Sequence, residues 1–94
     1  MIDFFSNFYI NIMSLIIYGW NWCPWCQKAK KLAKMKGISF KFIDIEKNPN
    51  QAYFPHTGKK ITSAPQIYMN GKFIGGYSDL EKLIGPMPLD IVYE

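Results

Sequence analysis

The chain has no arginine, one histidine and only two cysteines. All eleven basic residues are lysines, so no side chain offers the planar fork that grips a phosphate or carboxylate with two hydrogen bonds. The net charge of +4 therefore favours small anionic ligands or acidic partner surfaces over nucleic acid. Two cysteines cannot form a disulfide framework. With His56 as the single histidine, a zinc site within one chain also lacks further good ligands.

Long apolar runs and a basic N-terminus are also missing. Residues 1–18 are apolar overall but carry four polar side chains, Asp3, Ser6, Asn7 and Asn11. No basic residue precedes Lys28, so the sequence predicts neither a secretory signal nor a membrane span. With 94 residues and 49% hydrophobic content, the chain can build one modest core. We expect residues 1–12 to be an N-terminal extension, for which disorder is one interpretation, before a single domain over residues 13–94.

The first half of the chain predicts a strand, a helix and a second strand. Ser14 to Tyr18 is a short apolar run, which is typical of a buried strand. Apolar residues recur at helical spacing from Pro24 to Lys36, and Gly37 suits the position just after a helix. The segment from Ser39 to Ile45 alternates apolar and polar residues, as a strand does. Strands joined by a helix of this size lie parallel, with a right-handed crossover.

The second half predicts a hairpin and a short helix. Two apolar runs, 66–70 and 72–74, flank Asn70-Gly71, which favours a tight turn of type I′. Ser78 can cap a helix over residues 79–84. Residues 46–61 are harder to interpret, because Pro49 and Pro55 leave room for at most about two helical turns.

Cys23 and Cys26 lie at the start of the predicted helix, with two residues between them. Thiol exchange requires a thiolate, and a free cysteine is mostly protonated at neutral pH. The unpaired N–H groups and the dipole of a helix start favour the anion at Cys23, in the capping position. Cys26 lies one turn further in, with an ordinary or raised pKa, and is placed to attack a mixed disulfide formed at Cys23. The pair can thus form a reversible disulfide; half of a metal site and two unreactive core cysteines are the alternatives.

Three motifs, in this order, resemble those of the glutaredoxins: Cys23-Pro24-Trp25-Cys26, the run Ser63 to Tyr68 (SAPQIY), and the run Ile74 to Leu80 (IGGYSDL). The likeness covers roughly residues 14–84. It implies a thioredoxin-like α/β fold in which a four-stranded mixed sheet is flanked by helices, in the order β-α-β-α-β-β-α. It also implies a glutathione-dependent thiol-disulfide oxidoreductase that reduces protein disulfides and glutathione mixed disulfides. Cys23 would attack the substrate, and Cys26 or glutathione would resolve the intermediate.

The resemblance further implies where glutathione binds. Pro65 should follow a cis peptide bond, and the backbone of Ala64 should pair with the tripeptide. The helix start at Ser78 and Asp79 can bind the γ-glutamyl carboxylate, while Asp79 pairs with the ammonium group. A simple turn with a capping serine is the alternative for this motif. The expected glutathione-binding residues are Trp25, Lys60, Ser63, Ala64, Pro65, Gly76, Tyr77, Ser78 and Asp79.

The sequence departs from the family pattern at the active-site loop. Trp20 stands where the family usually has a lysine or arginine that meets a glutathione carboxylate. Lys59 or Lys60 must therefore contribute more to this contact, and Lys60 is the better match to the family's basic residue near the cis-proline loop. Trp25 replaces the common tyrosine and, with Trp20 and Trp22, makes an aromatic rim; ordinary packing is an equal interpretation for Trp22. The loss of a basic residue favours one alternative, a thioredoxin-like electron donor reduced by a flavoprotein. Another is a dimer that binds a glutathione-ligated iron–sulfur cluster, which the proline after Cys23 disfavours.

The expected partners also follow from the resemblance. Glutathione serves as co-substrate, no cofactor is permanently bound and no metal takes part. Substrates would be disulfide-containing or glutathionylated proteins, with ribonucleotide reductase as one candidate, and neither nucleic acid nor a membrane is expected. We expect a cytoplasmic monomer. A composition rich in Ile, Lys, Asn and Phe without Arg indicates an AT-rich genome; for a viral source the location would be the host cytoplasm.

Overall fold

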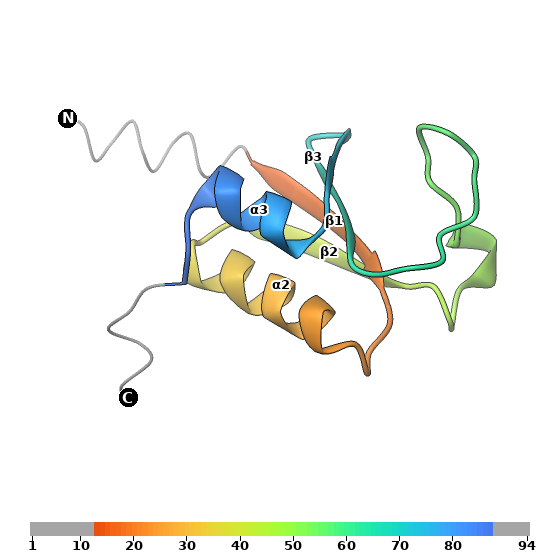
Figure 1. Cartoon of the computed structure of the whole chain (residues 1–94), viewed down its shortest axis with the longest axis horizontal. Helices are drawn as coiled ribbons and strands as arrows, with labels where there is room; N and C mark the ends of the chain where they lie inside the picture. The colour runs from red at the N-terminus through yellow and green to blue at the C-terminus, as the bar shows by residue number, and fades with distance from the viewer. Residues whose placement is uncertain (1–12, 88–94) are drawn as a thin grey trace.

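The structure is a computed structural model that describes residues 13–87 (Figure 1). Its elements are β1 (Ser14–Gly19), α2 (Pro24–Met35), β2 (Ser39–Asp44), a 3-10 helix η1 (Pro49–Gln51), β3 (Gln66–Met69), β4 (Lys72–Gly75) and α3 (Tyr77–Ile84). Each strand and the first helix are within a residue or so of the predicted bounds. The expected extension over residues 1–12 and the tail 88–94 lie outside the described residues.

The four strands form one mixed sheet in the order β2-β1-β3-β4, which confirms the expected fold class. β1 pairs in parallel with β2, from Ser14 opposite Ser39 to Gly19 opposite Asp44. β1 pairs antiparallel with β3, and β3 with β4. Because α2 connects the two parallel strands, its N-terminus follows the end of the central strand β1. The residues between Gly19 and Pro24 therefore lie at one edge of the sheet, where several strand ends meet.

The turn between β3 and β4 has the predicted conformation. Asn70 and Gly71 both have positive φ, 51° and 84°, as a type I′ turn requires. The Asn70 side chain also accepts a hydrogen bond from the N–H of Ser14 at 2.9 Å, while its own N–H donates to the Ser14 carbonyl at 2.8 Å. The hairpin turn is thus fastened to the start of the central strand, which helps to fix the register of β3 on β1.

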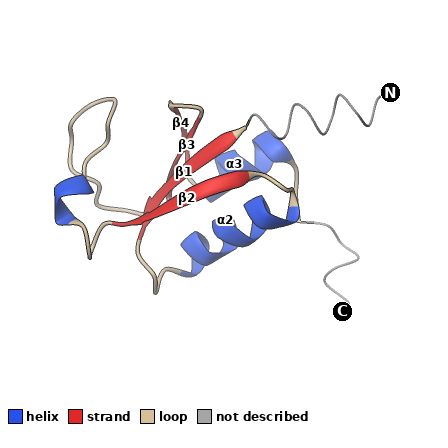
Figure 2. Ribbon diagram, turned by 180° about the vertical axis from the view of Figure 1, so that it is seen from behind, coloured by secondary structure: helices blue, strands red, loops and turns tan. Residues whose placement is uncertain are grey.

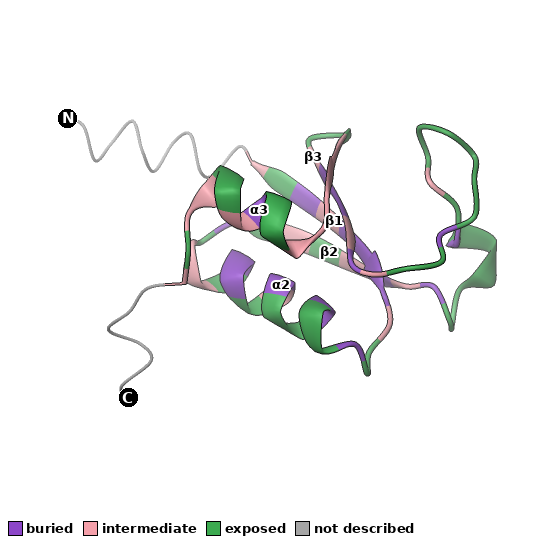
Figure 3. Cartoon of the chain, viewed as in Figure 1, coloured by how far each residue is buried: buried purple, intermediate pink, exposed green. Residues whose placement is uncertain are grey.

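Helices α2 and α3 lie on the same face of the sheet, because both contribute to one core cluster with β1 and β3. Seen from behind, α3 lies beyond the strands and α2 runs below β2 (Figure 2). Figure 3 shows buried segments in the strands and in α2 and α3. The core on this face comprises residues of these elements and of the turn before β2: Leu15, Ile17, Ala29, Leu32, Ala33, Ile38, Ile67 and Leu80. A second cluster lies between the sheet and the segment that follows β2: Tyr18, Ile43, Ile45, Ala52, Ile61 and Tyr68. The two clusters hold the sheet from both sides.

The segment between β2 and β3 has less helix than the family pattern implies. Its only helical turn among the described residues is η1, which Pro49 opens, so the second helix of the expected order is a single 3-10 turn here. A tight turn follows, in which the N–H groups of Phe54 and Gly58 donate to the carbonyls of Lys59 and Phe54, respectively. Aromatic packing takes the place of a helix, because His56 stacks on Phe73 with ring centroids 4.7 Å apart.

The last helix begins earlier than predicted. We expected Ser78 to cap a helix that starts at Asp79, but α3 starts at Tyr77 and Gly76 is the capping residue. The reason is the side chain of Asp79, whose carboxylate reaches back and accepts a hydrogen bond from the N–H of Gly76 at 3.0 Å. This contact is half of a capping box, and it places Ser78 inside the first turn. The predicted end of the helix, at Ile84 before Gly85, is confirmed.

Candidate active site

Cys23 occupies the N-cap of α2, as the sequence predicts. Its backbone is extended (φ −81°, ψ 116°), and its Sγ accepts a hydrogen bond from the N–H of Cys26 at 3.2 Å. Pro24 takes the first helical position, where a missing N–H costs nothing. A sulfur in this position faces the partial positive charge of the helix start. The Cys23 side chain is only 6% exposed, so a substrate must approach it from a defined direction.

Cys26 is fully buried one turn further along α2. Burial raises the pKa of the Cys26 thiol to about 12, and its hydrogen bond with Cys23 contributes to the increase. The prediction of a normal or raised pKa is thereby confirmed in its direction. At neutral pH this thiol keeps its proton, so Cys26 is unsuited to the first attack on a substrate and suited to a later, intramolecular step.

Gly19 makes room for Cys26, a role that the sequence reasoning missed. A methyl group built on Gly19 would overlap the Sγ of Cys26, so only glycine allows the sulfur to approach the end of β1 this closely. In the sequence, Gly19 is simply the residue that ends the apolar run from Ser14 to Tyr18. A glycine directly before a two-cysteine loop is the signal that could have indicated close packing.

The loop that carries Pro65 lies opposite Cys23. The peptide bond between Ala64 and Pro65 is cis, as the resemblance implies. The Cys23 thiol lies 3.8 Å from the carbonyl oxygen of Ala64, to which its S–H can donate. Two segments that are far apart in the sequence therefore meet at the reactive sulfur.

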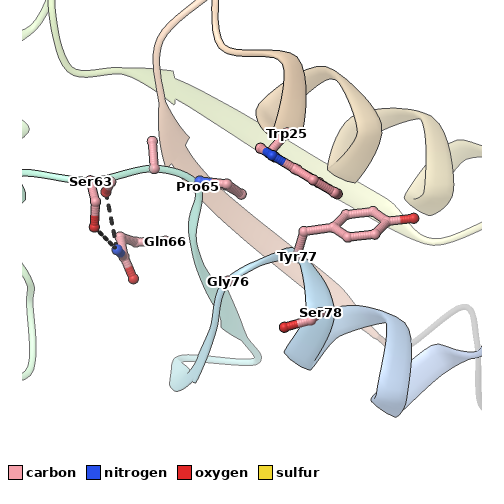
Figure 4. A pocket seen from close by; sticks show the side chains of 8 residues that line it. Trp25, Ser63, Pro65, Gln66, Gly76, Tyr77 and Ser78 are labelled. Atoms are coloured by element: carbon pink, nitrogen blue, oxygen red, sulfur yellow. Dashed lines mark hydrogen bonds between the residues drawn. The ribbon is translucent and has the colours of Figure 1, made fainter.

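A cavity of about 390 Å³ adjoins this meeting point (Figure 4). In Figure 4 the ring of Trp25 lies over that of Tyr77, with centroids 5.4 Å apart, and both residues line the cavity. Seven of the nine expected glutathione-binding residues line the cavity: Trp25, Ser63, Ala64, Pro65, Gly76, Tyr77 and Ser78. Three separate segments of the chain thus supply one concave surface beside Cys23.

Gln66 also lines the cavity, although the sequence reasoning did not select it. Its side-chain amide donates two hydrogen bonds to Ser63, one to the carbonyl and one to the hydroxyl, each at 3.0 Å (Figure 4). Because Gln66 follows Pro65 directly, these bonds close a small loop around the cis peptide. In the sequence Gln66 was the first residue of a predicted strand and part of the SAPQIY motif, but neither indicated its side-chain contact with Ser63.

The other two expected residues, Lys60 and Asp79, do not line the cavity. Lys60 is exposed, and its backbone pairs with that of Tyr53 in a single antiparallel β-bridge. The Asp79 carboxylate is engaged with the N–H of Gly76, so its observed role is to cap α3. No basic side chain is among the eight residues that line the cavity.

The aromatic rim that we expected divides into two parts. Trp25 belongs to the cavity and is 51% exposed. Trp20 packs against the second core cluster and stacks on Trp22, with centroids 5.2 Å apart. The indole N–H of Trp22 donates to the Glu46 carboxylate at 2.8 Å. Trp20 and Trp22 therefore brace the loop before Cys23 without lining the cavity.

The described residues contain neither a metal-binding cluster nor a membrane-spanning helix. Within residues 13–87, no three histidine, cysteine or acidic side chains lie together as a metal site would need. Across the same described part of the chain, neither helix has the length and apolar character required to cross a bilayer.

Comparison with known proteins gives consistent results. The family model described as Glutaredoxin matches residues 15–74. A glutaredoxin of Haemophilus influenzae is 35% identical over 79 residues, which cover 77% of this chain and 91% of that protein. The solution structure of a glutaredoxin from Brucella melitensis is similar with a TM-score of 0.59 and 33% identity, over 74% of this chain and 76% of that one.

One structural neighbour has a different name. The Escherichia coli NrdH-redoxin, described as a glutaredoxin-like protein with a thioredoxin-like activity profile, has a TM-score of 0.61 and 21% identity, over 80% of this chain and 99% of that one. At this identity the likeness concerns the fold alone. The same fold therefore occurs in proteins of different activity profiles, so the reductant must be inferred from the site.

Proposed function

Because this chain belongs to the glutaredoxin family, whose members are thiol-disulfide oxidoreductases, we propose that it reduces protein disulfides and glutathione mixed disulfides with glutathione as its co-substrate. The observation that carries the proposal is the position of the Cys23 sulfur. It caps the start of α2, faces the Ala64 carbonyl and adjoins a cavity lined by three chain segments.

The first step uses Cys23 as the nucleophile. Its thiolate attacks one sulfur of the substrate disulfide, forms a new S–S bond and releases the other sulfur as a thiolate, which takes up a proton. With a glutathionylated protein, attack on the glutathione sulfur leaves glutathione on Cys23 and releases the protein thiol. A second glutathione then attacks that sulfur, so oxidised glutathione leaves and Cys23 is regenerated.

The second route uses Cys26. When a protein disulfide is the substrate, Cys23 becomes linked to that protein. Cys26 loses its proton and attacks the Cys23 sulfur, which forms the Cys23–Cys26 disulfide and releases the reduced protein. Two glutathione molecules reduce this disulfide again. The raised pKa of Cys26 supports this order, because a thiol that stays protonated does not compete with Cys23 for the substrate.

The size and lining of the cavity support a tripeptide as the ligand. A volume of about 390 Å³ lies in the range typical of small-molecule sites, roughly 300–1,000 Å³. The backbone of Ala64 is available for strand-like pairing. Tyr77 and Ser78 belong to the first turn of α3, whose N–H groups can bind the γ-glutamyl carboxylate. Asp79, next along the helix, carries the charge that would meet the ammonium group.

The cellular compartment of the reaction follows from its reductant, glutathione. Glutaredoxins work near about −200 to −230 mV, a range that a cytosolic glutathione pool can maintain, so we propose a cytoplasmic location. Glutathionylated proteins and ribonucleotide reductase fit as substrates of a monomeric enzyme.

A thioredoxin-like donor is the second candidate, and one observation favours it. Trp20 replaces the usual basic residue, and no lysine is among the residues that line the cavity. A glutathione carboxylate would therefore lack an opposite charge there. In this case a flavoprotein reductase, rather than glutathione, would return electrons to the Cys23–Cys26 disulfide.

The electron source distinguishes the two candidates. The oxidised protein is incubated either with glutathione, glutathione reductase and NADPH, or with thioredoxin reductase and NADPH, and consumption of NADPH is followed with a small mixed disulfide as substrate. We expect turnover with the glutathione system and only a background rate with thioredoxin reductase. The reverse result would replace the proposal with the second candidate.

A further inference from the structure

The outer side of α2 is a lysine-rich surface that the proposed reaction does not use. Its inner side is buried, with Cys26, Ala29, Leu32 and Ala33 in contact with the sheet and α3. Most of the remaining positions of the helix are exposed, drawn green in Figure 3, and Lys30 and Met35 are half-buried. Three lysines spaced three residues apart are among the exposed residues, Lys28, Lys31 and Lys34. We call these three residues the α2 lysine surface.

The charge of this surface has no acidic counterpart on its own helix. Residues 24–35 contain no aspartate or glutamate. All eleven lysines lie within residues 13–87, whereas only four acidic residues do. Three of these four accept hydrogen bonds elsewhere: Asp44 from backbone N–H groups, Glu46 from Trp22, and Asp79 from Gly76. Lysines three residues apart repel one another on a helix, so the arrangement lowers helix stability in the isolated protein.

The α2 lysine surface is continuous with the active site. The Nζ of Lys28 lies 4.5 Å from the centre of the Trp25 ring, and Trp25 lines the cavity. Cys23 begins the same helix, and with a rise of 1.5 Å per residue Lys34 lies only about 16 Å further along its axis. A protein whose disulfide reaches Cys23 covers several hundred Å² around it, which is enough to overlie these side chains.

From these observations we propose that the α2 lysine surface docks acidic protein substrates, with the disulfide presented to Cys23 from an acidic segment. The proposal rests on the proposed function and names the substrate class for the same site. The lysine ammonium is a compact, strongly hydrated charge that attracts anions over a distance, whereas arginine forms bidentate hydrogen bonds. Such a surface raises the rate of encounter with an oppositely charged partner and leaves the chemical step unchanged.

The test uses three glutathionylated peptides that differ only in whether the residues around the mixed disulfide are acidic, neutral or basic. A small uncharged mixed disulfide reports on the rate of the reaction in the absence of docking. The α2 variant carries Lys31→Glu and Lys34→Glu. The matched control carries Lys41→Glu and Lys72→Glu, which change the net charge equally at exposed positions on β2 and β4. Values of kcat and KM are measured at low and at high ionic strength.

For the wild type we expect kcat/KM to be about tenfold higher with the acidic peptide than with the neutral one at low ionic strength. The α2 variant should lose this advantage and the control variant should keep most of it. The advantage should also shrink at high ionic strength, because salt screens exposed charges. All variants should reduce the small uncharged substrate at the wild-type rate.

Three results would overturn the proposal: no preference for the acidic peptide, an equal loss of preference in both variants, or a duplex oligonucleotide that binds the surface more tightly than the acidic peptide does. The second result would assign the effect to net charge, and the third would make nucleic acid the partner. Failure of the wild type with the small uncharged disulfide would contradict the proposed function instead.

Discussion

Cys23 and Cys26 are one helical turn apart, yet their surroundings suit them to different steps. The Cys23 sulfur accepts a hydrogen bond from an N–H group of the helix start. It also lies opposite the carbonyl of Ala64, a residue that lines the cavity. Cys26 has no exposed surface and lies against Gly19, and this burial outweighs the backbone of Trp20 and the charge of Lys30, so the pKa of its thiol is raised. In the proposed mechanism the nucleophile is therefore the thiol beside the cavity, and the resolving thiol is the one with no exposed surface.

The raised pKa of Cys26 predicts how its labelling depends on pH. Because the thiolate reacts with iodoacetamide, a pKa of about 12 means that little of Cys26 is reactive at neutral pH and more becomes so as the pH rises. We expect mass spectrometry of the reduced protein to find label on Cys23 first at pH 7. Label on Cys26 should increase steadily towards pH 12. Equal labelling of both residues at pH 7 would contradict these roles.

Gln66 provides a second prediction for a single residue. Gln66→Leu removes both hydrogen bonds to Ser63, which are worth about 0.5–1.5 kcal/mol each, and loosens the loop that faces Cys23. We expect KM for a glutathione mixed disulfide to rise about tenfold, with kcat close to that of the wild type. The matched control is Gln51→Leu, an exposed position in η1, which should change neither. An unchanged KM in Gln66→Leu would show that Ser63 holds its position without this amide.

At the scale of single elements, the sequence predicted the elements whose signals are local. The bounds of α2 follow from Pro24 at its start and Gly37 after its end, and the hairpin follows from Asn70-Gly71. The start of α3 was misplaced for an equally local reason. A side chain two residues inside the helix, Asp79, caps it from within, and the sequence offered Ser78 as an equally suitable cap.

The two roles of Asp79 can be separated by a pair of variants. Asp79→Ala removes the acceptor for the Gly76 N–H and should lower the free energy of unfolding by about 1 kcal/mol in urea denaturation. Asp79→Asn keeps an oxygen acceptor and should retain most of that stability. Both remove the charge that would meet the glutathione ammonium, so both should raise KM for glutathione. An Asn variant with wild-type KM would limit Asp79 to capping.

At the scale of the whole molecule, the order of the strands could be predicted from the sequence. The packing of the segment between β2 and β3 on the face opposite the helices could not. The parallel pair followed from a strand-helix-strand pattern, and the rest from the hairpin and the family resemblance. The packing of His56 on Phe73 and its hydrogen bond with the hydroxyl of Tyr68, at 2.6 Å, join a loop to distant strands. Contacts of this kind leave no periodic pattern in the sequence.

The extent of the folded unit is a further prediction at this scale. The family match covers residues 15–74, and the described residues 13–87 contain both core clusters and the site. We expect the free energy of unfolding of a chain that begins at Met13, measured in urea, to lie within about 0.5 kcal/mol of that of the full chain. Its turnover should also match. A large loss of stability would mean that residues 1–12 belong to the domain.

The central claim, that Cys23 performs the attack and Cys26 only resolves, is tested most directly by one measurement: glutathione-coupled reduction of a small glutathione mixed disulfide by the wild type, Cys23→Ser and Cys26→Ser. The account predicts that Cys23→Ser falls to the uncatalysed rate. Cys26→Ser should keep a substantial part of the wild-type rate, because glutathione itself can resolve the intermediate. Turnover by Cys23→Ser at the wild-type rate would contradict the account.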